Sequence, residues 1–271
     1  MLLEKYRTND GPRWALDGRF LPASLSLGTL LDLPSGSMFQ LLQSLSNGEA
    51  AFGERVAPLD PHHEVWAAGV TYLRSRDARR DESTVADMYE RVYEAARPEI
   101  FFKSIGWRVA GTGGSIRIRS DSKWNVPEPE LVLVINRHGE IVGYCAGNDV
   151  SSRDIEGENP LYLPQAKNYD GACALGPAIL LCEAEEIAGI PIQLEIQRGG
   201  ERIFEAATTT ATMKRSLNEL VHYLTLELDF PQGALLMTGT CLVPGGDFTL
   251  QPADVVRIQV GALTIQNQVS T

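Results

Sequence analysis

The sequence predicts an α+β fold that is rich in strands, and three observations point to this class. Short apolar stretches bounded by glycine, proline or small polar residues recur along most of the chain, which is typical of proteins with many strands. Only three stretches show the spacing of apolar residues that indicates a helix. The length of 271 residues is enough to bury a substantial core and to form more than one unit.

Residues 1–60 are expected to form a small N-terminal α+β lobe, and residues 61–271 a larger C-terminal domain. In the lobe, apolar stretches are broken by glycine and proline, and the spacing within residues 38–45 predicts a helix. Two prolines give residues 57–61 the composition of a linker. The apolar residues 65–70 then predict the first strand of the larger domain.

A helix is expected over residues 72–97, because the apolar residues of its second half recur on one helical face and Pro98 follows. Residues 74–82 at its start are densely charged and have little apolar surface to bury. We therefore expect this segment to close over a bound ligand.

Two acids are expected on one face of a strand at Trp124–Asp154, the most informative stretch of the chain. The proline at position 129 favours an extended backbone at Glu128, and residues two apart on a strand point the same way. Glu128 and Glu130 should therefore lie side by side at the start of an apolar strand that ends at Ile135.

The next residues predict a hairpin that brings in a third acid. Residues 136–139 have the composition of a turn, and a return strand begins at Ile141. A turn centred on Arg137 and His138 sets Asp149 opposite Val126, close to the two glutamates. Three carboxylates close together favour a divalent cation, and oxygen ligands alone favour Mg²⁺, with Mn²⁺ or Ca²⁺ possible, over zinc or copper. On spacing alone, a solvated acidic face is the competing interpretation.

The remaining pattern is mostly strands. A helix is expected after Ser216, because Ser216 and Glu219 have the spacing of a capping box and leucines follow at intervals of four. The glycine-rich run 110–115 lacks the Gly-Lys-Ser/Thr ending of a phosphate loop and predicts a turn. The expected strands are 115–119, 178–182, 192–198, 202–206, 234–237, 255–260 and 262–266.

Composition and charge limit the classes of function. A net charge of −11 without a long basic stripe argues against nucleic acid as a partner. No apolar run is long enough to span a membrane, and the first residues lack the pattern of a secretory signal. The four cysteines are far apart, which favours free thiols over disulfides or a zinc site. We expect a cytoplasmic protein that acts on a small molecule.

Several motifs resemble the fumarylacetoacetate hydrolase family over roughly residues 65–265. The resemblance rests on V-P-E-P-E-L at 126–131, on G-N-D-V-S-S-R-D at 147–154, and on the runs at 97–103, 157–167 and 237–240. It implies a mixed β-roll or barrel-like domain that carries the active site at its mouth, with Glu128, Glu130 and Asp149 holding the metal. It also implies a homo-oligomer, a dimer or a tetramer.

Within the family, the residues around Ser75, Glu99 and Lys167 are most similar to lyases that dehydrate 2-keto-3-deoxy sugar acids, such as 2-keto-3-deoxy-D-arabinonate. The resemblance assigns proton transfer to Glu99 and Lys167, and leaves open which is the base. Hydrolases of the family have a water-activating histidine where this chain has Ser75, which argues against hydrolysis of a C–C bond.

Four residues are expected to bind the substrate, a 2-keto acid. They are Tyr72, Ser75, Arg153 and Thr240. For Arg153 a second role is equally expected, which is to hold Asp149 in place by an ion pair. The hydroxyl and backbone of Thr240 can hydrogen-bond a substrate carboxylate.

Two other functions stay open on the sequence. The same metal chelate would serve a hydrolase or decarboxylase of acylpyruvates or oxaloacetate, and a member without activity would only bind a keto acid. A histidine supplied from elsewhere would favour the first alternative, and loss of the metal the second.

Overall fold

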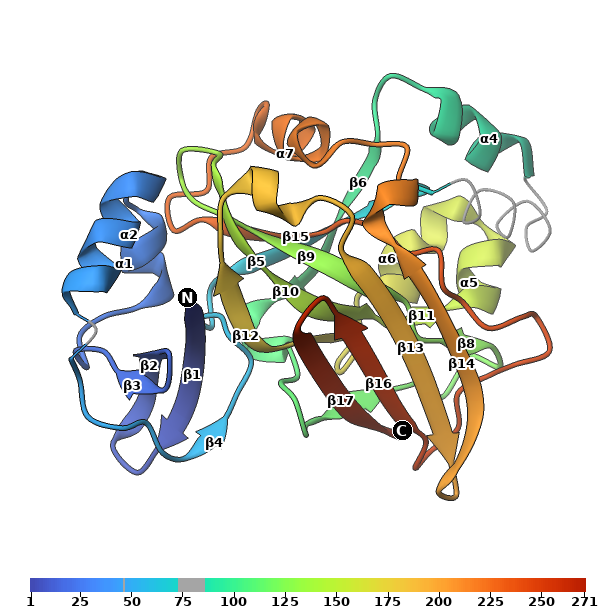
Figure 1. Ribbon diagram of the computed structural model, residues 1–271. Coiled ribbons are helices and arrows are strands. Elements are labelled where there is room, and N and C mark those ends of the chain that lie inside the picture. The colour runs from blue at the N-terminus through green and yellow to red at the C-terminus, as the bar shows by residue number, and fades with distance from the viewer. Residues whose placement is uncertain (46, 73–85) are drawn as a thin grey trace.

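The computed structural model describes residues 1–45, 47–72 and 86–271, which form three sheets and a few short helices (Figure 1). The largest sheet has ten strands in the order β3-β2-β1-β12-β10-β9-β15-β5-β6, with β4 paired to β1. Its strands are β1 (Leu2–Thr8), β2 (Gly11–Leu16), β3 (Arg19–Phe20), β4 (Glu54–Arg55), β5 (Glu64–Gly69), β6 (Glu99–Ile105), β9 (Pro129–Ile135), β10 (Ile141–Asp149), β12 (Cys173–Leu181) and β15 (Ala234–Met237).

A second sheet of five strands lies in front of the first in Figure 1, in the order β14-β13-β16-β17-β7. Its strands are β7 (Ser115–Arg117), β13 (Pro191–Arg198), β14 (Glu201–Thr209), β16 (Val255–Val260) and β17 (Leu263–Ser270). A two-stranded sheet pairs β8 (Asn125–Val126) with β11 (Ser151–Ser152). Within the described residues no sheet closes into a barrel, so the domain is an open roll.

The helices are short and lie at the edges of the sheets (Figure 1). They are α1 (Leu27–Leu31), α2 (Ser35–Ser44), α4 (Ala86–Glu94), α5 (Arg153–Glu158), α6 (Leu163–Lys167) and α7 (Leu217–Thr225). Four 3-10 helices cover Gly106–Arg108, Pro160–Tyr162, Ala184–Ile187 and Thr210–Thr212. No helix in the described ranges is long and apolar enough to cross a membrane.

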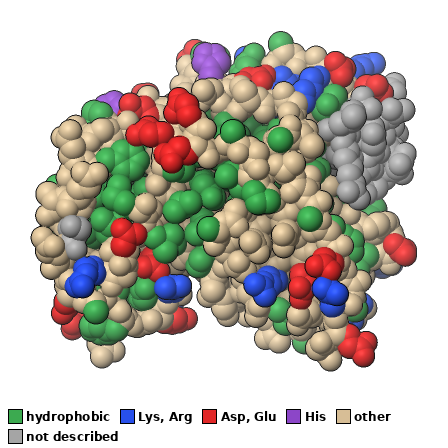
Figure 2. All heavy atoms as spheres, in the orientation of Figure 1, with side chains coloured by type: hydrophobic (Ala, Val, Ile, Leu, Met, Phe, Trp, Pro, Cys, Tyr) green, Lys and Arg blue, Asp and Glu red, His purple; other side chains and the backbone are tan. Residues whose placement is uncertain are grey.

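The main core lies between the ten-stranded and five-stranded sheets. Every residue of β9 and β10 is buried, because both faces of these central strands are covered, which explains the unbroken apolar run at 131–135. On β17, buried residues alternate with less buried ones, because one face packs on the core. On the face shown in Figure 2, hydrophobic side chains gather between the N-terminal helices and the five-stranded sheet.

The N-terminal segment shares its sheet with the rest of the chain. Strand β1 pairs antiparallel with β12, so Leu3 lies opposite Ile179. Lys5, also on β1, forms an ion pair of 3.0 Å with Asp60 in the predicted linker. The boundary at residue 60 stays a prediction, and the ten-stranded sheet runs across it.

Most predicted elements are confirmed, among them the helix over 38–45, the turn within 110–115 and the strands from 115 onward. Ser216 caps α7 by accepting a hydrogen bond of 3.1 Å from the backbone N–H of Glu219. The predicted start of a helix at Tyr72 is wrong, since Tyr72 forms an isolated bridge with Met213 and the described helix begins at Ala86. The segment 74–82, predicted to close over a ligand, lies outside the described residues.

The hairpin of β9 and β10 is confirmed, but its predicted register is wrong by two residues. Asp149 lies opposite Glu128, whose carbonyl accepts a hydrogen bond of 2.9 Å from the Asp149 N–H, and Val126 pairs with Ser151. Ile141 pairs with Ile135, so the turn centres on His138 and accounts for one of the two residues. The other comes from a register shift between Ile141 and Gly143, where a β-bulge adds a residue to β10. Spacing along the sequence cannot reveal such an insertion, which here brings Asp149 nearer to the glutamates.

Candidate metal centre and active site

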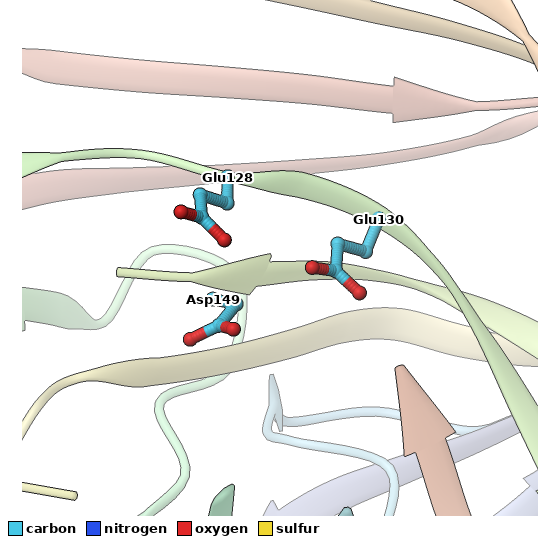
Figure 3. A group of neighbouring side chains, drawn as sticks. All are labelled: Glu128, Glu130 and Asp149. Atoms are coloured by element: carbon cyan, nitrogen blue, oxygen red, sulfur yellow. The ribbon is translucent and has the colours of Figure 1, made fainter. Parts of the chain in front are cut away.

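Three carboxylates converge at the open end of the β9–β10 hairpin (Figure 3). Glu128 immediately precedes β9, Glu130 lies on β9 and Asp149 ends β10. One oxygen from each side chain lies within 4.8 Å of the others. The predicted convergence of these acids is therefore confirmed, while their role as metal ligands remains a proposal.

The carboxylates are buried, which makes their charge costly. Glu128, Glu130 and Asp149 are each no more than 2% exposed. Burial, and then the charges of Asp149 and Glu128, raise the pKa of Glu130 well above its ordinary value, although Lys167 opposes this. Buried charges are stable only when they are paired or bound to a cation, so this cluster requires positive charge beside it as compensation.

Lys167 supplies part of that compensation. It ends α6, and its Nζ donates hydrogen bonds to Glu128 Oε2 at 2.8 Å, Asp149 Oδ2 at 2.9 Å and Ser151 Oγ at 2.5 Å. Its ammonium also lies 5.8 Å from the ring centre of Phe101 on β6. The structure thus places this predicted catalytic residue directly against two of the three acids.

Lys103 is a second buried cation that sequence reasoning missed. Its Nζ lies 2.5 Å from Asp149 Oδ1 and donates hydrogen bonds to the carbonyls of Val150 at 3.1 Å and Lys167 at 2.7 Å. The pairing of β5 with β6 shifts register at this point, and such bulges redirect a side chain. The available signal was a lysine at the end of the apolar run Ile100–Phe102.

Arg153 holds a metal-ligand candidate other than the predicted one. Its guanidinium forms an ion pair of 2.9 Å with Glu128 Oε1, and its Nε lies 4.0 Å from Glu156 Oε2. The ion pair with Asp149, one of its two expected roles, is wrong, because the ion pairs of Asp149 are with Lys103 and Lys167. Arg153 therefore positions Glu128 at the mouth of the hairpin.

The Thr238–Gly239–Thr240 turn closes the site beside Glu130. The N–H of Gly239 donates a hydrogen bond of 2.6 Å to Glu130 Oε2. Gly239 has a φ of +94°, and a Cβ there would lie 2.1 Å from Thr71 Oγ1, so only glycine fits. The adjacent Thr240 is buried, and its hydroxyl accepts a hydrogen bond of 3.3 Å from the N–H of Leu242.

Two other predicted residues flank this cluster. Glu99 begins β6, where it shares a strand face with Phe101, and its carboxylate packs against Gly69, since a Cβ there would lie 2.1 Å from Glu99 Oε2. Tyr72 is buried, and burial, then Cys241 and Glu130, raise the pKa of its hydroxyl. Ser75 lies outside the described residues.

The donor set fits a hard divalent cation. Each of the three residues offers carboxylate oxygens, and within the described ranges they make up the one group of three potential ligands that converges. The fold and this cluster define a carboxylate centre on an open β-roll, with two lysines beside it.

Comparison with known proteins identifies the family to which this β-roll with its carboxylate centre belongs. The model of the fumarylacetoacetate (FAA) hydrolase C-terminal region matches residues 64–270, and the chain belongs to that family. It is 51% identical to the "Probable 2-keto-3-deoxyxylonate dehydratase" of Haloferax volcanii over 82% of this chain and 77% of the relative. It is 45% identical to the 2-dehydro-3-deoxy-D-arabinonate dehydratase of Saccharolobus solfataricus over 75% of this chain and 70% of the relative.

A solved structure matches the whole chain. It is 2-keto-3-deoxy-D-arabinonate dehydratase complexed with magnesium and 2,5-dioxopentanoate, with a TM-score of 0.79, 33% identity, and coverage of 100% of this chain and 99% of the other. The predicted family and the strand-rich α+β fold are confirmed.

Proposed function

We propose that this protein is a Mg²⁺-dependent hydro-lyase that dehydrates a 2-keto-3-deoxy sugar acid, best matched by 2-keto-3-deoxy-D-arabinonate giving 2,5-dioxopentanoate. The observation that carries the proposal is the contact of Lys167 with Glu128 and Asp149 in a buried carboxylate cluster. Two curated relatives at 51% and 45% identity carry dehydratase names for this substrate class, which supports the same reaction here.

Glu128, Glu130 and Asp149 would hold the Mg²⁺, with Mn²⁺ or Ca²⁺ as possible substitutes. When bound, the ion supplies Lewis acidity to the carboxylate and keto oxygens of a 2-keto acid. The protein keeps these acids in place with Arg153 on Glu128, Gly239 on Glu130 and Lys103 on Asp149.

Lys167 and Glu99 would move the protons. One of them takes a proton from C3, and the other gives a proton to the C4 hydroxyl, which leaves as water. The unsaturated acid then isomerises to the five-carbon aldehyde, so all the carbons stay in one chain. Lys167 is the better placed of the two, because its Nζ already contacts the oxygens of two proposed metal ligands.

The substrate contacts are proposed from position and chemistry. Thr240 would hydrogen-bond the substrate carboxylate, because it follows the Gly239 N–H that holds Glu130. Tyr72 lies near Glu130 and would close one side of the pocket. Arg153 would contact the substrate while it keeps its ion pair with Glu128. The proposed contact of Ser75 is inferred from its position in the sequence alone.

We also propose a cytoplasmic homo-oligomer, a dimer or tetramer, that acts in pentose oxidation. All four cysteines are free, as in reducing compartments. The oligomer is proposed from the family to which the chain belongs.

A panel assay tests the reaction class. The purified protein with Mg²⁺ is incubated with 2-keto-3-deoxy acids, acylpyruvates and oxaloacetate, and the products are identified. Dehydration of a 2-keto-3-deoxypentonate as the fastest reaction supports the proposal. Faster cleavage of an acylpyruvate or decarboxylation of oxaloacetate would replace it with the hydrolase or decarboxylase alternative.

A further inference from the structure

A basic groove lies at the seam between the N-terminal segment and the larger domain, on a protein whose net charge is −11. It has a volume of about 480 Å³. Its charged lining residues are Lys5, Arg7, Glu54, Arg55, Arg108 and Arg117. Five of these six are cationic, so the local potential is opposite in sign to the net charge.

Three of the basic residues already have acidic partners. Lys5 pairs with Asp60 at 3.0 Å, Arg7 with Glu54 at 3.0 Å, and Arg55 with Glu4 at 2.8 Å. These pairs all lie on the wall formed by β1, β4 and the linker. That wall is electrically compensated and serves mainly to fix the shape of the groove.

The opposite wall carries uncompensated donors. Neither Arg108 nor Arg117 forms an ion pair with a carboxylate among the described residues. The Nε of Arg108 and the hydroxyl of Thr112, which also lines the groove, are both buried without a hydrogen-bond partner in the described part of the chain. Buried donors of this kind are normally satisfied, and an anion in the groove would satisfy them.

Two glycines allow this wall to form. A Cβ on Gly111 would lie 2.6 Å from the backbone N of Ala57, so the turn after Ala110 can approach the linker only because it has no side chain there. Gly171 has a φ of +76°, and a Cβ on it would lie 2.7 Å from Cγ of Arg117. Gly111, in the glycine-rich run, and Gly171 therefore let the segments that form this wall approach each other closely.

We propose that this groove is a second binding site, specific for a compact phosphate-class dianion. Arg108 ends a 3-10 helix, Thr112 lies four residues later in the following turn, and both line this groove, so one anionic centre between them could accept from both. Arginine forks and a hydroxyl match the several acceptor oxygens of a phosphate group. An extended dicarboxylate would divide its charge between two ends and use these donors less well.

The groove wall is hydrogen-bonded to the strand beside the carboxylate cluster. The N–H of Ala110 donates to the carbonyl of Cys173 at 2.9 Å, and the N–H of Leu175 donates to the carbonyl of Ala110 at 2.9 Å. Cys173 lies opposite Asp149 in the pairing of β12 with β10. An anion in the groove would therefore brace a segment that supports the proposed metal site.

Trp107 provides a local probe, because it lines the groove, is 65% exposed and lies under the Arg108 guanidinium at 5.1 Å. Metal-free protein is titrated with inorganic phosphate at constant ionic strength, and tryptophan emission and Tm are measured. We expect a saturable change in emission with a dissociation constant of about 1 mM or tighter, and a rise in Tm of about 2 °C or more. Trp107→Phe should lose the emission change and keep the rise in Tm.

Substitutions of the lining residues test whether phosphate binds in this groove. The double variant Arg108→Gln, Arg117→Gln should weaken phosphate binding by at least about tenfold, and Thr112→Val, which nearly keeps the side-chain shape, by a few-fold. Arg202→Gln is the control, because Arg202 is exposed and pairs with Glu205 on β14. Undiminished binding in both test variants, no saturable response in the wild type, or tighter binding of succinate than of phosphate would overturn the proposal.

Discussion

Lys103 Nζ lies 2.5 Å from Oδ1 of Asp149, and both side chains are no more than 2% exposed. The same ammonium donates hydrogen bonds to the carbonyls of Val150 and Lys167, so one lysine joins the end of β10 to the end of α6. It thereby fixes Asp149 and Lys167, the proposed catalytic lysine, relative to each other.

Replacing Lys103 with Met should destabilise the protein by about 3–5 kcal/mol, because it leaves the Asp149 carboxylate buried without one of its cations. Urea unfolding measures this change in the free energy of unfolding. Lys123→Met is the matched control, since Lys123 is exposed, and it should stay within about 0.5 kcal/mol of the wild type. Equal urea-unfolding midpoints for Lys103→Met and Lys123→Met would mean that Lys103 does not hold the site together.

Replacing Lys167 with Met should lower kcat by on the order of 10² or more, because a general acid or base commonly contributes 10²–10⁴-fold. Glu99→Gln should behave similarly. Mg²⁺ affinity, measured by calorimetry, should be at least as tight in Lys167→Met as in the wild type, because an ammonium that contacts Glu128 and Asp149 has been removed. A kcat within a few-fold of the wild type would remove Lys167 from the proton-transfer step.

The double variant Glu128→Gln, Glu130→Gln should lose Mg²⁺ binding and turnover together, because two of three proposed carboxylate ligands become neutral amides. Calorimetry and the dehydration assay measure the two properties separately. Full activity in the metal-stripped double variant would show that the cluster is not a metal site. A raised Mg²⁺ requirement with an unchanged maximal rate would mean that other groups complete it.

The raised pKa of Glu130 predicts how Mg²⁺ and pH act together. In the metal-free protein its folded pKa lies above its ordinary value of 4.5, so the stability it contributes is full below that value and is lost as pH rises through the folded pKa. Mg²⁺ binds the ionised form, so the rise in Tm caused by Mg²⁺ should grow over the same pH window. Thermal unfolding with and without Mg²⁺, from about pH 5 to about pH 8, measures this rise in Tm. In Glu130→Gln the rise in Tm should depend less on pH.

The acids could be predicted from the sequence because their signal is local. Pro129 sets the backbone of Glu128, and the Glu-x-Glu spacing places both glutamates on one face. Asp149 needed only a hairpin with a recognisable turn. Its partner was misplaced by two residues, because the turn centres on His138 alone and because the bulge between Ile141 and Gly143 has no composition that distinguishes it.

Contacts between distant segments were beyond sequence reasoning. Lys103 meets Asp149 and Lys167, which are 46 and 64 residues further along the chain, so no spacing rule links them. The helices α5 and α6 are only 6 and 5 residues long, too short for a periodic apolar pattern. They are held instead by tertiary contacts such as the pair of Arg153 with Glu128.

The central claim is that the protein eliminates water and leaves the carbon chain intact. Uniformly ¹³C-labelled 2-keto-3-deoxy-D-arabinonate is incubated with the protein and Mg²⁺, and the products are followed by NMR. The account predicts one five-carbon product, 2,5-dioxopentanoate, with its aldehyde carbon coupled into the same chain and its rate lowered by on the order of 10² in Lys167→Met. Labelled pyruvate formed with a separate two-carbon fragment, at a rate that Lys167→Met does not change, would contradict it.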